Sequence, residues 1–199
     1  MSDSAAQPEF WNTRYAAGRT PWDFGGVPAA LGEFLVRHPG AGRRVLVPGC
    51  GSGYEVAALH AAGWEPTAID FSPSAVARAH ATLGPAHAAR VVLGDFFAHD
   101  FAKAPFDFIY ERTFLCALPP RLRADYARRI AALLAPGGQL AGFFFFTETP
   151  PDDGPPFGLA PGEPEQLFAA DLALEVDAPA SDSLPIFAGK ERWQERRRR

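Results

Sequence analysis

The sequence has few cysteines and no long hydrophobic run. Only two cysteines, Cys50 and Cys116, occur among its 199 residues, so a disulfide framework is excluded and a reducing compartment, the cytoplasm, is expected. The longest apolar run that holds the phenylalanines, residues 141–146, is interrupted by Gly142. It is far too short to cross a bilayer. The N-terminus carries neither a basic segment nor an apolar stretch, so no secretory signal and no membrane association are predicted.

Positive charge is scarce as well. Lys and Arg total 19 against 23 Asp and Glu, which gives a net charge of −4. A nucleic-acid-binding protein needs a basic face, so no nucleic-acid partner is predicted. Almost all of the basic charge is arginine, and residues 196–199 are four arginines at the end of the chain. Because terminal runs of like charge are usually solvated, we expect a frayed tail there.

Enough apolar material is present for a folded core, since 47% of the residues are hydrophobic and 13% are aromatic. Short apolar segments with strand character lie at residues 44–47, 66–69, 90–93, 106–110, 139–146, 172–176 and 184–188. Segments with helical character lie at residues 28–37, 55–62, 75–83, 121–134 and 164–170. This alternation predicts an α/β fold in a single domain, with a Rossmann-like seven-stranded, mostly parallel sheet and helices on both faces. Before residue 40 we expect an irregular aromatic cap and only the one helix.

A glycine-rich turn joins the first predicted strand to a helix. Gly49, Gly51 and Gly53 follow Pro48 in a G-x-G-x-G pattern. Such a turn lets a ligand approach bare backbone, and the amides at the helix N-terminus point at it. The dinucleotide fingerprint has one more residue between its second and third glycines, which weakens an NAD interpretation. A tight connection that binds nothing is the alternative.

Acidic residues follow the next two strands. Asp70 ends the second strand, where a carboxylate can accept both hydroxyls of an adenosine ribose. Asp95 and Phe96 follow the third, where they can meet the adenine amino group and pack on the base. The alternatives are an ordinary turn residue for Asp70 and a capping aspartate before core phenylalanines. Arg112 follows the fourth strand, so all of these groups are expected at the same edge of the sheet.

The order of these features resembles the class I S-adenosylmethionine-dependent methyltransferases, in which a Pro-Gly-Gly segment such as residues 136–138 also precedes the fifth strand. That class usually has an acidic residue where this chain has Pro48. The string at residues 46–51, with Pro-Trp-Asp at 21–23 before it and residues 114–119 after it, is similar to the thiopurine S-methyltransferase superfamily. Within that superfamily the similarity is closest to the thiol and halide methyltransferases, and it runs from about residue 10 to residue 157.

The resemblance implies the class I methyltransferase fold, S-adenosylmethionine as the cofactor, and methyl transfer to a small soft nucleophile: a thiol, a thiopurine, hydrosulfide or a halide. An oxygen, nitrogen or metalloid acceptor and a non-catalytic S-adenosylmethionine-binding regulatory protein remain alternatives. The implied cofactor contacts are Trp11, Tyr15, Trp22, Gly49, Gly51, Gly53, Asp70, Phe71, Asp95, Phe96 and Arg112. Pro155 and Phe157 belong to a Gly-Pro-aromatic segment that would border the acceptor pocket.

The physical chemistry agrees with this resemblance. The methyl donor is a sulfonium cation, and an aromatic face attracts a cation by roughly 0.5–2 kcal/mol. We therefore interpret residues 1–40 as an aromatic lid, 41–147 as the cofactor-binding core, and 148–199 as the acceptor loop and C-terminal strands. The alternative for the aromatic rings is that they only pin the N-terminal arm to the core.

Arg112 is the one candidate catalytic residue, because a nearby cation lowers the pKa of a thiol. Its alternative role is as partner of the cofactor carboxylate or as a structural residue. Cys50 and Cys116 are assigned to packing, and the scattered histidines show no metal-ligand spacing, so no metal is expected. We also expect a monomer.

Overall fold

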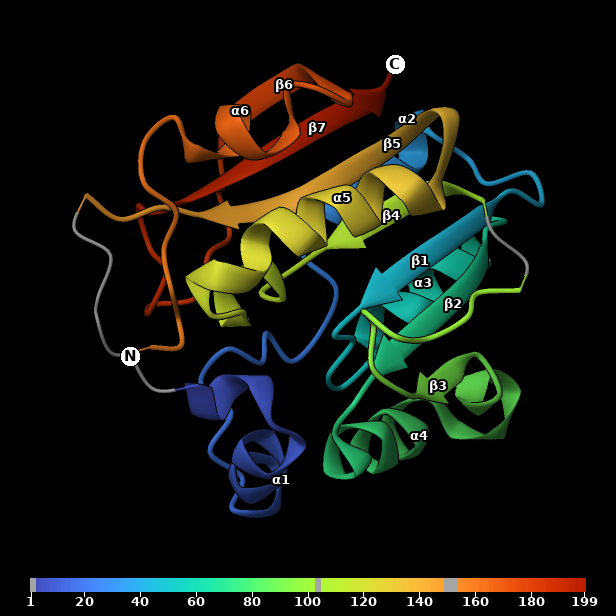
Figure 1. Cartoon of the computed structure of the whole chain (residues 1–199). Helices are drawn as coiled ribbons and strands as arrows, with labels where there is room; N and C mark the ends of the chain where they lie inside the picture. The colour runs from blue at the N-terminus through green and yellow to red at the C-terminus, as the bar shows by residue number, and fades with distance from the viewer. Residues whose placement is uncertain (1–2, 103–104, 149–153) are drawn as a thin grey trace.

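The structure, a computed structural model, describes residues 3–102, 105–148 and 154–199. Its centre is a seven-stranded sheet with the order β3-β2-β1-β4-β5-β7-β6. The strands are β1 (Arg44–Pro48), β2 (Glu65–Asp70), β3 (Val91–Leu93), β4 (Phe106–Glu111), β5 (Leu134–Phe145), β6 (Leu172–Pro179) and β7 (Glu191–Arg198). Only the pairings of β7 with β5 and β6 are antiparallel. The prediction of a mostly parallel, seven-stranded α/β sheet is confirmed (Figure 1).

Helices cover both faces of the sheet. The helices are α1 (Pro8–Ala16), α2 (Ala29–Arg37), α3 (Tyr54–Ala61), α4 (Pro73–Ala88), α5 (Arg123–Leu133) and α6 (Glu163–Phe168), and the 3-10 turns are η1 (Asp3–Ala6), η2 (Leu115–Ala117) and η3 (Pro120–Leu122). One buried core joins α2, α3 and α4 to the side chains of Phe108 and Phe143. The other joins α5 and α6 to Ile109 and Phe144. Adjacent residues of one strand thus pack into cores on opposite faces of the sheet, because successive side chains of a strand point to opposite faces.

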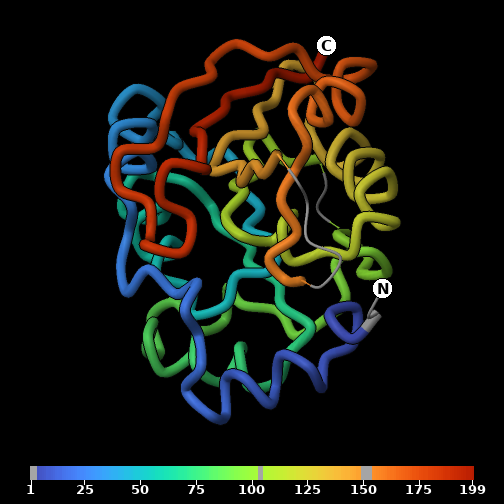
Figure 2. The backbone as a smooth tube through the Cα atoms, turned by 90° about the vertical axis from the view of Figure 1, so that its left-hand side faces the viewer, coloured from blue at the N-terminus to red at the C-terminus, as the bar shows by residue number. Residues whose placement is uncertain are grey.

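The strand order changes direction between β1 and β4. From β1 the chain continues outward to β2 and β3, and it then returns to β4 on the other side of β1. In open α/β sheets such a reversal leaves a crevice at the carboxyl ends of the strands. The N-terminal segment lies beyond these strand ends and packs on α4, as the blue trace in Figures 1 and 2 shows.

The region before residue 40 differs from the prediction. It holds two helices, α1 and α2, and not one. The first was missed because α1 buries none of its residues and so carries no apolar stripe. In α4, the predicted helix end at residue 83 coincides with a kink: Gly84 is non-helical, and a second short helical segment from Pro85 to Ala88 follows it.

The end of the chain also differs. Residues 184–188 were predicted to be a strand, but they lie in turns, and the strand is β7. β7 was missed because its sequence is charged and lacks an apolar run.

The prediction of a frayed arginine tail is likewise wrong. Arg196 is 1% exposed, and its guanidinium donates to Glu165 at 2.9 Å and to Gln194 at 3.0 Å. Its guanidinium carbon lies 5.3 Å from the ring centre of Phe168, which covers its flat face.

These pairings make the terminal arginines part of the fold. Arg196 and Arg197 face Leu140 and Gln139 of β5, so deleting residues 196–199 should lower the free energy of unfolding by more than about 2 kcal/mol. Deleting Arg199 alone is the control and should cost less than about 0.5 kcal/mol. Urea unfolding of both proteins measures the difference. Equal stability of the long deletion and the full chain would contradict the place of these residues in β7.

Candidate active site

The glycine turn after β1 is shaped by close neighbours. Gly49 has φ +58°, and a Cβ there would fall on the ring of Phe114. Gly51 has φ +52°, and a Cβ there would lie 2.6 Å from the Tyr15 hydroxyl. Both the left-handed backbone and the crowding exclude a side chain at these two positions. The turn therefore exposes bare backbone between β1 and α3.

Asp70, at the end of β2, holds this turn in place. Its Oδ2 accepts a hydrogen bond from the Gly51 amide at 3.0 Å, and its Oδ1 accepts one from the Ser72 amide at 2.9 Å. Burial raises the pKa of Asp70, and the two backbone donors oppose that shift. Asp95 lies in a similar turn after β3, where its Oδ1 accepts from the Phe97 amide at 2.9 Å. Both carboxylates thus have a structural bond and still line the same cavity.

The N-terminal segment presents a cluster of rings to the strand ends. Trp11 and Trp22 meet edge to face with ring centres 5.3 Å apart. Tyr15 meets Trp22 in the same way at 6.0 Å and accepts a hydrogen bond from its indole nitrogen at 3.4 Å. Burial raises the pKa of Tyr15, so its hydroxyl stays protonated. The rings contact one another as a unit.

Polar contacts fasten this segment to the core. The Ser52 hydroxyl donates to Asp23 at 2.6 Å, and Arg78 of α4 forms an ion pair with the same carboxylate at 3.3 Å. The Ser72 hydroxyl donates to Asn12 Oδ1 at 2.6 Å. These contacts reach the glycine turn and the start of α4, so the N-terminal segment is fastened at the places where the predicted cofactor residues stand.

The carboxyl end of β4 is organised by a buried acid. Glu111 is fully buried, and its Oε1 accepts hydrogen bonds from the amides of Phe114 and Leu115 at 2.9 and 2.8 Å. The hydroxyl of Tyr126 donates to its Oε2 at 2.5 Å. Burial raises the pKa of Glu111 to about 7. Between Glu111 and these amides, Thr113 has φ +58°, a strained conformation for a β-branched residue that such fixed neighbours can impose.

Arg112 follows directly and is held by rings. Its guanidinium carbon lies 4.9 Å from the ring centre of Phe24 and 4.3 Å from that of Phe143. Nη1 and Nη2 are buried and have no hydrogen-bond partner among the described residues. Burial raises the pKa of Glu55 to about 7 and also raises that of Glu191, and the charge of the Arg112 guanidinium opposes both shifts. A buried cation with unused donors at a cavity is an obvious partner for an anionic group.

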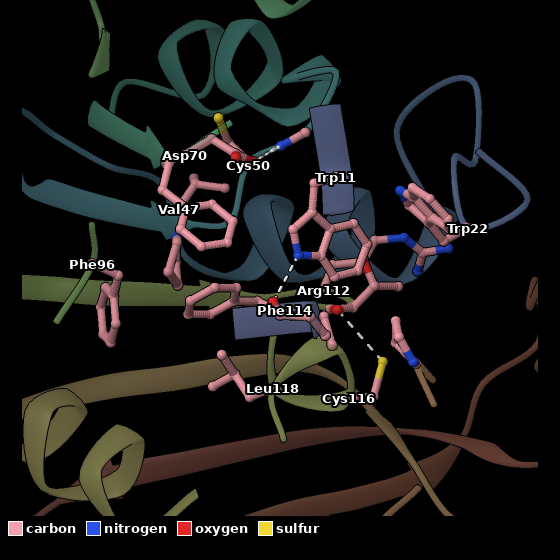
Figure 3. Close-up of a pocket in the computed structure, with 18 of the residues that line it drawn as sticks. Trp11, Trp22, Val47, Cys50, Asp70, Phe96, Arg112, Phe114, Cys116 and Leu118 are labelled. Atoms are coloured by element: carbon pink, nitrogen blue, oxygen red, sulfur yellow. Dashed lines mark hydrogen bonds between the residues drawn. The ribbon is translucent and has the colours of Figure 1, made fainter. Parts of the chain in front are cut away.

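The glycine turn, Asp70, Asp95, the N-terminal rings and Arg112 line one cavity of about 660 Å³ (Figure 3), a size suited to a small-molecule ligand. Every predicted cofactor residue lines it: Trp11, Tyr15, Trp22, Gly49, Gly51, Gly53, Asp70, Phe71, Asp95, Phe96 and Arg112. Of the predicted acceptor-side residues, Pro155 lines the cavity. Phe157 is 3% exposed, is not among the lining residues, and donates its amide to the Cys116 carbonyl at 2.6 Å.

Several lining residues were not predicted. Glu55 lies two residues after Gly53, and its closeness to the glycine turn is a sequence signal that could have placed it at the site. Tyr110 precedes Glu111 and looks in sequence like a core residue. Ile186 and Phe187 come from turns far along the chain, and no local pattern marks them. Cys50 and Cys116 both line the cavity, and burial raises the pKa of both thiols, which disfavours a thiolate nucleophile at either position.

The cavity fits S-adenosylmethionine. The glycine turn lines the cavity with bare backbone at Gly49, Gly51 and Gly53. The unpartnered donors of Arg112 suit a carboxylate, and the rings of Trp11 and Trp22 suit a sulfonium cation. Together with the strand reversal between β1 and β4, these features define a class I S-adenosylmethionine-dependent methyltransferase.

Comparisons with known proteins agree and narrow the class. The family model for thiopurine S-methyltransferase matches residues 6–198, and the chain belongs to that family. A probable thiol methyltransferase 2 of Arabidopsis thaliana is 34% identical over 88% of this chain and 78% of its own. A thiopurine S-methyltransferase of Xanthobacter autotrophicus is 31% identical over 92% of both chains.

Solved structures share the fold. A 1,6-didemethyltoxoflavin-N1-methyltransferase of Burkholderia thailandensis, solved with bound S-adenosylhomocysteine, covers 96% of this chain and 86% of its own at 23% identity and a TM-score of 0.75. A magnesium protoporphyrin IX methyltransferase of Synechocystis, solved with bound S-adenosylmethionine, covers 100% and 98% at 15% identity and a TM-score of 0.76. No helix in the described part of the chain is long and apolar enough to cross a membrane.

The buried Glu111 makes stability depend on pH. Its pKa rises from an ordinary 4.5 to about 7 on folding, so the folded state binds more protons than the unfolded state between these values. The free energy of unfolding should therefore fall as the pH rises from about 5 to 7, with a slope of at most about 1.4 kcal/mol per pH unit for this group. Glu111→Gln keeps acceptors for the two amides and should reduce that slope. Urea unfolding at several pH values measures it.

Glu55→Gln is the matched variant, because the pKa of Glu55 also rises to about 7. Glu55→Gln should remove the contribution of Glu55 to the slope of unfolding free energy against pH and leave the contribution of Glu111. A slope that is identical in the wild type and in Glu111→Gln would contradict the protonation of Glu111 in this pH range.

Proposed function

We propose that this enzyme methylates the sulfur of a small thiol or a comparable soft nucleophile. One observation carries the proposal: the unpartnered guanidinium of Arg112 lies at a cavity that Leu118, Pro155 and Phe187 also line. An apolar wall beside a guanidinium suits a polarisable anion such as a thiolate better than a strongly hydrated one. The names of the relatives, thiol and thiopurine methyltransferases, support the same acceptor class.

The chain divides this work among three parts. Residues 1–40 form the aromatic lid, residues 41–147 bind the cofactor, and residues 148–199 supply the acceptor wall, all within one methyltransferase domain. The glycine turn and Asp70 would hold the sugar and amino-acid parts of S-adenosylmethionine, and Asp95 with Phe96 would hold its base. When bound, S-adenosylmethionine supplies an electrophilic methyl group.

The residues of the chain then contribute position and environment. Trp11, Tyr15 and Trp22 close over the site and exclude water, which strengthens every charge interaction inside. Arg112 donates to an anionic group and, beside an acceptor thiol, favours the thiolate. Because displacement at carbon depends on alignment, holding both reactants in one cavity supplies much of the rate. Arg112 is accordingly the one residue with a proposed catalytic role.

A panel of acceptors tests the sulfur assignment. The purified protein is incubated with S-adenosylmethionine and with matched thiols, alcohols and amines of the same carbon skeleton. We expect methylated thiols, with rates that follow the thiolate fraction as the pH rises. S-adenosylhomocysteine formation, followed by chromatography, is the measurement.

Other outcomes separate the alternatives. Turnover of only the alcohols, the amines or a metalloid acceptor would overturn the sulfur assignment and leave the class intact. Tight binding of S-adenosylmethionine with no turnover of any acceptor would identify a regulatory binding protein.

The proposed contact between the lid and the sulfonium is tested by comparing a positively charged ligand with an uncharged one. Trp22→Leu removes an aromatic face, so affinity for the sulfonium cofactor should fall by about 2- to 30-fold, the equivalent of roughly 0.5–2 kcal/mol. Affinity for S-adenosylhomocysteine, whose sulfur is uncharged, should fall by less. Trp22→Phe keeps an aromatic face and is the control, so it should keep most of the wild-type difference in affinity between the charged cofactor and S-adenosylhomocysteine. Isothermal titration measures both ligands, and an equal loss for both would show that the ring only pins the N-terminal arm.

A further inference from the structure

Two of the segments that form the proposed acceptor wall are loops next to each other, and neither is part of the sheet. One is the connection from β4 to α5, which contributes Cys116 and Leu118 to the cavity. The other is the loop after β5, which contributes Pro155 and Pro156. The size and shape of the acceptor space therefore depend on how these two segments are held relative to each other.

Arg123, the first residue of α5, joins them. It is 3% exposed, and one of its terminal nitrogens, Nη2, donates to the carbonyls of Phe157 and Gly158 at 2.8 and 3.1 Å. The other, Nη1, donates to Glu163 Oε1 at 2.6 Å. The second oxygen of Glu163 accepts the Ala160 amide at 2.8 Å. One buried guanidinium thus binds the loop at two places, at residues 157 and 158 and at Glu163 in the first turn of α6.

Three further backbone hydrogen bonds fix where Arg123 must hold the loop, and in one of them the Leu159 carbonyl accepts the Thr147 amide at 3.0 Å. The Phe157 amide donates to the Cys116 carbonyl at 2.6 Å, which connects the two walls directly. The Leu159 amide donates to the Phe145 carbonyl at 2.8 Å, at the end of β5. Between these bonds the carbonyls of residues 157 and 158 point inward, and buried carbonyls need donors. Arginine can satisfy both and reach an acid as well, because its donors are spread over a planar fork.

We infer that Arg123 and Glu163 are positioning residues that set the acceptor space and so determine acceptor affinity and selectivity. Neither lines the cavity, so they act through the loop and not by contact with either reactant. The cofactor turn and Asp70 belong to other strands, so cofactor binding should be independent of this clamp. The inference rests on the proposed function only in taking the side of the cavity that Pro155 and Pro156 line as the acceptor side.

The test compares two arginine–glutamate pairs whose glutamates both lie on α6. Arg123→Lys and Glu163→Gln loosen the clamp with little change in volume. Arg196→Lys and Glu165→Gln are the matched controls, because Arg196 is also buried and pairs with Glu165 of α6 at 2.9 Å, away from the cavity. For each protein we would measure unfolding, the Kd of S-adenosylhomocysteine, the acceptor KM over thiols of increasing size, and hydrogen exchange of the amides at 157–160.

For the clamp variants we expect an acceptor KM at least about tenfold higher, reduced discrimination by thiol size, and at least about tenfold faster exchange at 157–160. The Kd of S-adenosylhomocysteine should stay within about twofold. The Arg196 and Glu165 controls should lose stability without these changes. If Arg123→Lys does not fold, Glu163→Gln carries the same comparison.

Distinct results would overturn the inference. Unchanged exchange at 157–160 would show that Arg123 does not position the loop. Faster exchange with an unchanged acceptor KM would show that loop position does not set acceptor affinity. If the wild type methylates no thiol, the proposed function fails, and the same KM comparison is made with the acceptor that it does methylate.

Discussion

The buried carboxylate of Glu111 is the contact on which the proposed acceptor side of the site depends. It accepts two backbone amides and the Tyr126 hydroxyl, and so fixes the direction in which the chain leaves β4. That direction places Arg112 between two rings, puts Thr113 in a left-handed conformation, and leads through Cys116 to the loop after β5. A charged group without solvent is costly, so its three donors are what make this position tolerable.

The cofactor side depends on a different kind of constraint, the absence of side chains. Gly49 and Gly51 leave bare backbone because Phe114 and Tyr15 occupy the space that a Cβ would need. One of these rings belongs to the β4–α5 connection and the other to the N-terminal segment. The glycine turn is therefore where the core, the N-terminal segment and the β4–α5 connection meet. This explains how a short turn can organise a cavity whose walls come from most of the chain.

Much of this was predictable from the sequence. The parallel strands were found because each is a short apolar run between turn residues, and the site edge was found because Asp70, Asp95 and Arg112 each follow such a run. Helix α1 and strand β7 were not found, since α1 buries no residue and β7 is charged. Arg196 shows the reason. Its guanidinium lies over the ring of Phe168 while one of its nitrogens donates to Glu165. The burial of this charge depends on these two neighbours, which the sequence around Arg196 does not indicate.

The sequence by itself determined the α/β alternation, the glycine turn and the residues that gather at the strand ends, because hydrophobic periodicity and glycine are local signals. The tertiary structure alone decided which distant groups satisfy the buried ones. Glu111 meets Tyr126, Arg123 meets Phe157 and Glu163, and the rings of Phe24 and Phe143 enclose Arg112. Such partners lie far apart along the chain. Their pairing follows from packing in three dimensions and from the cost of leaving a buried polar group without a partner.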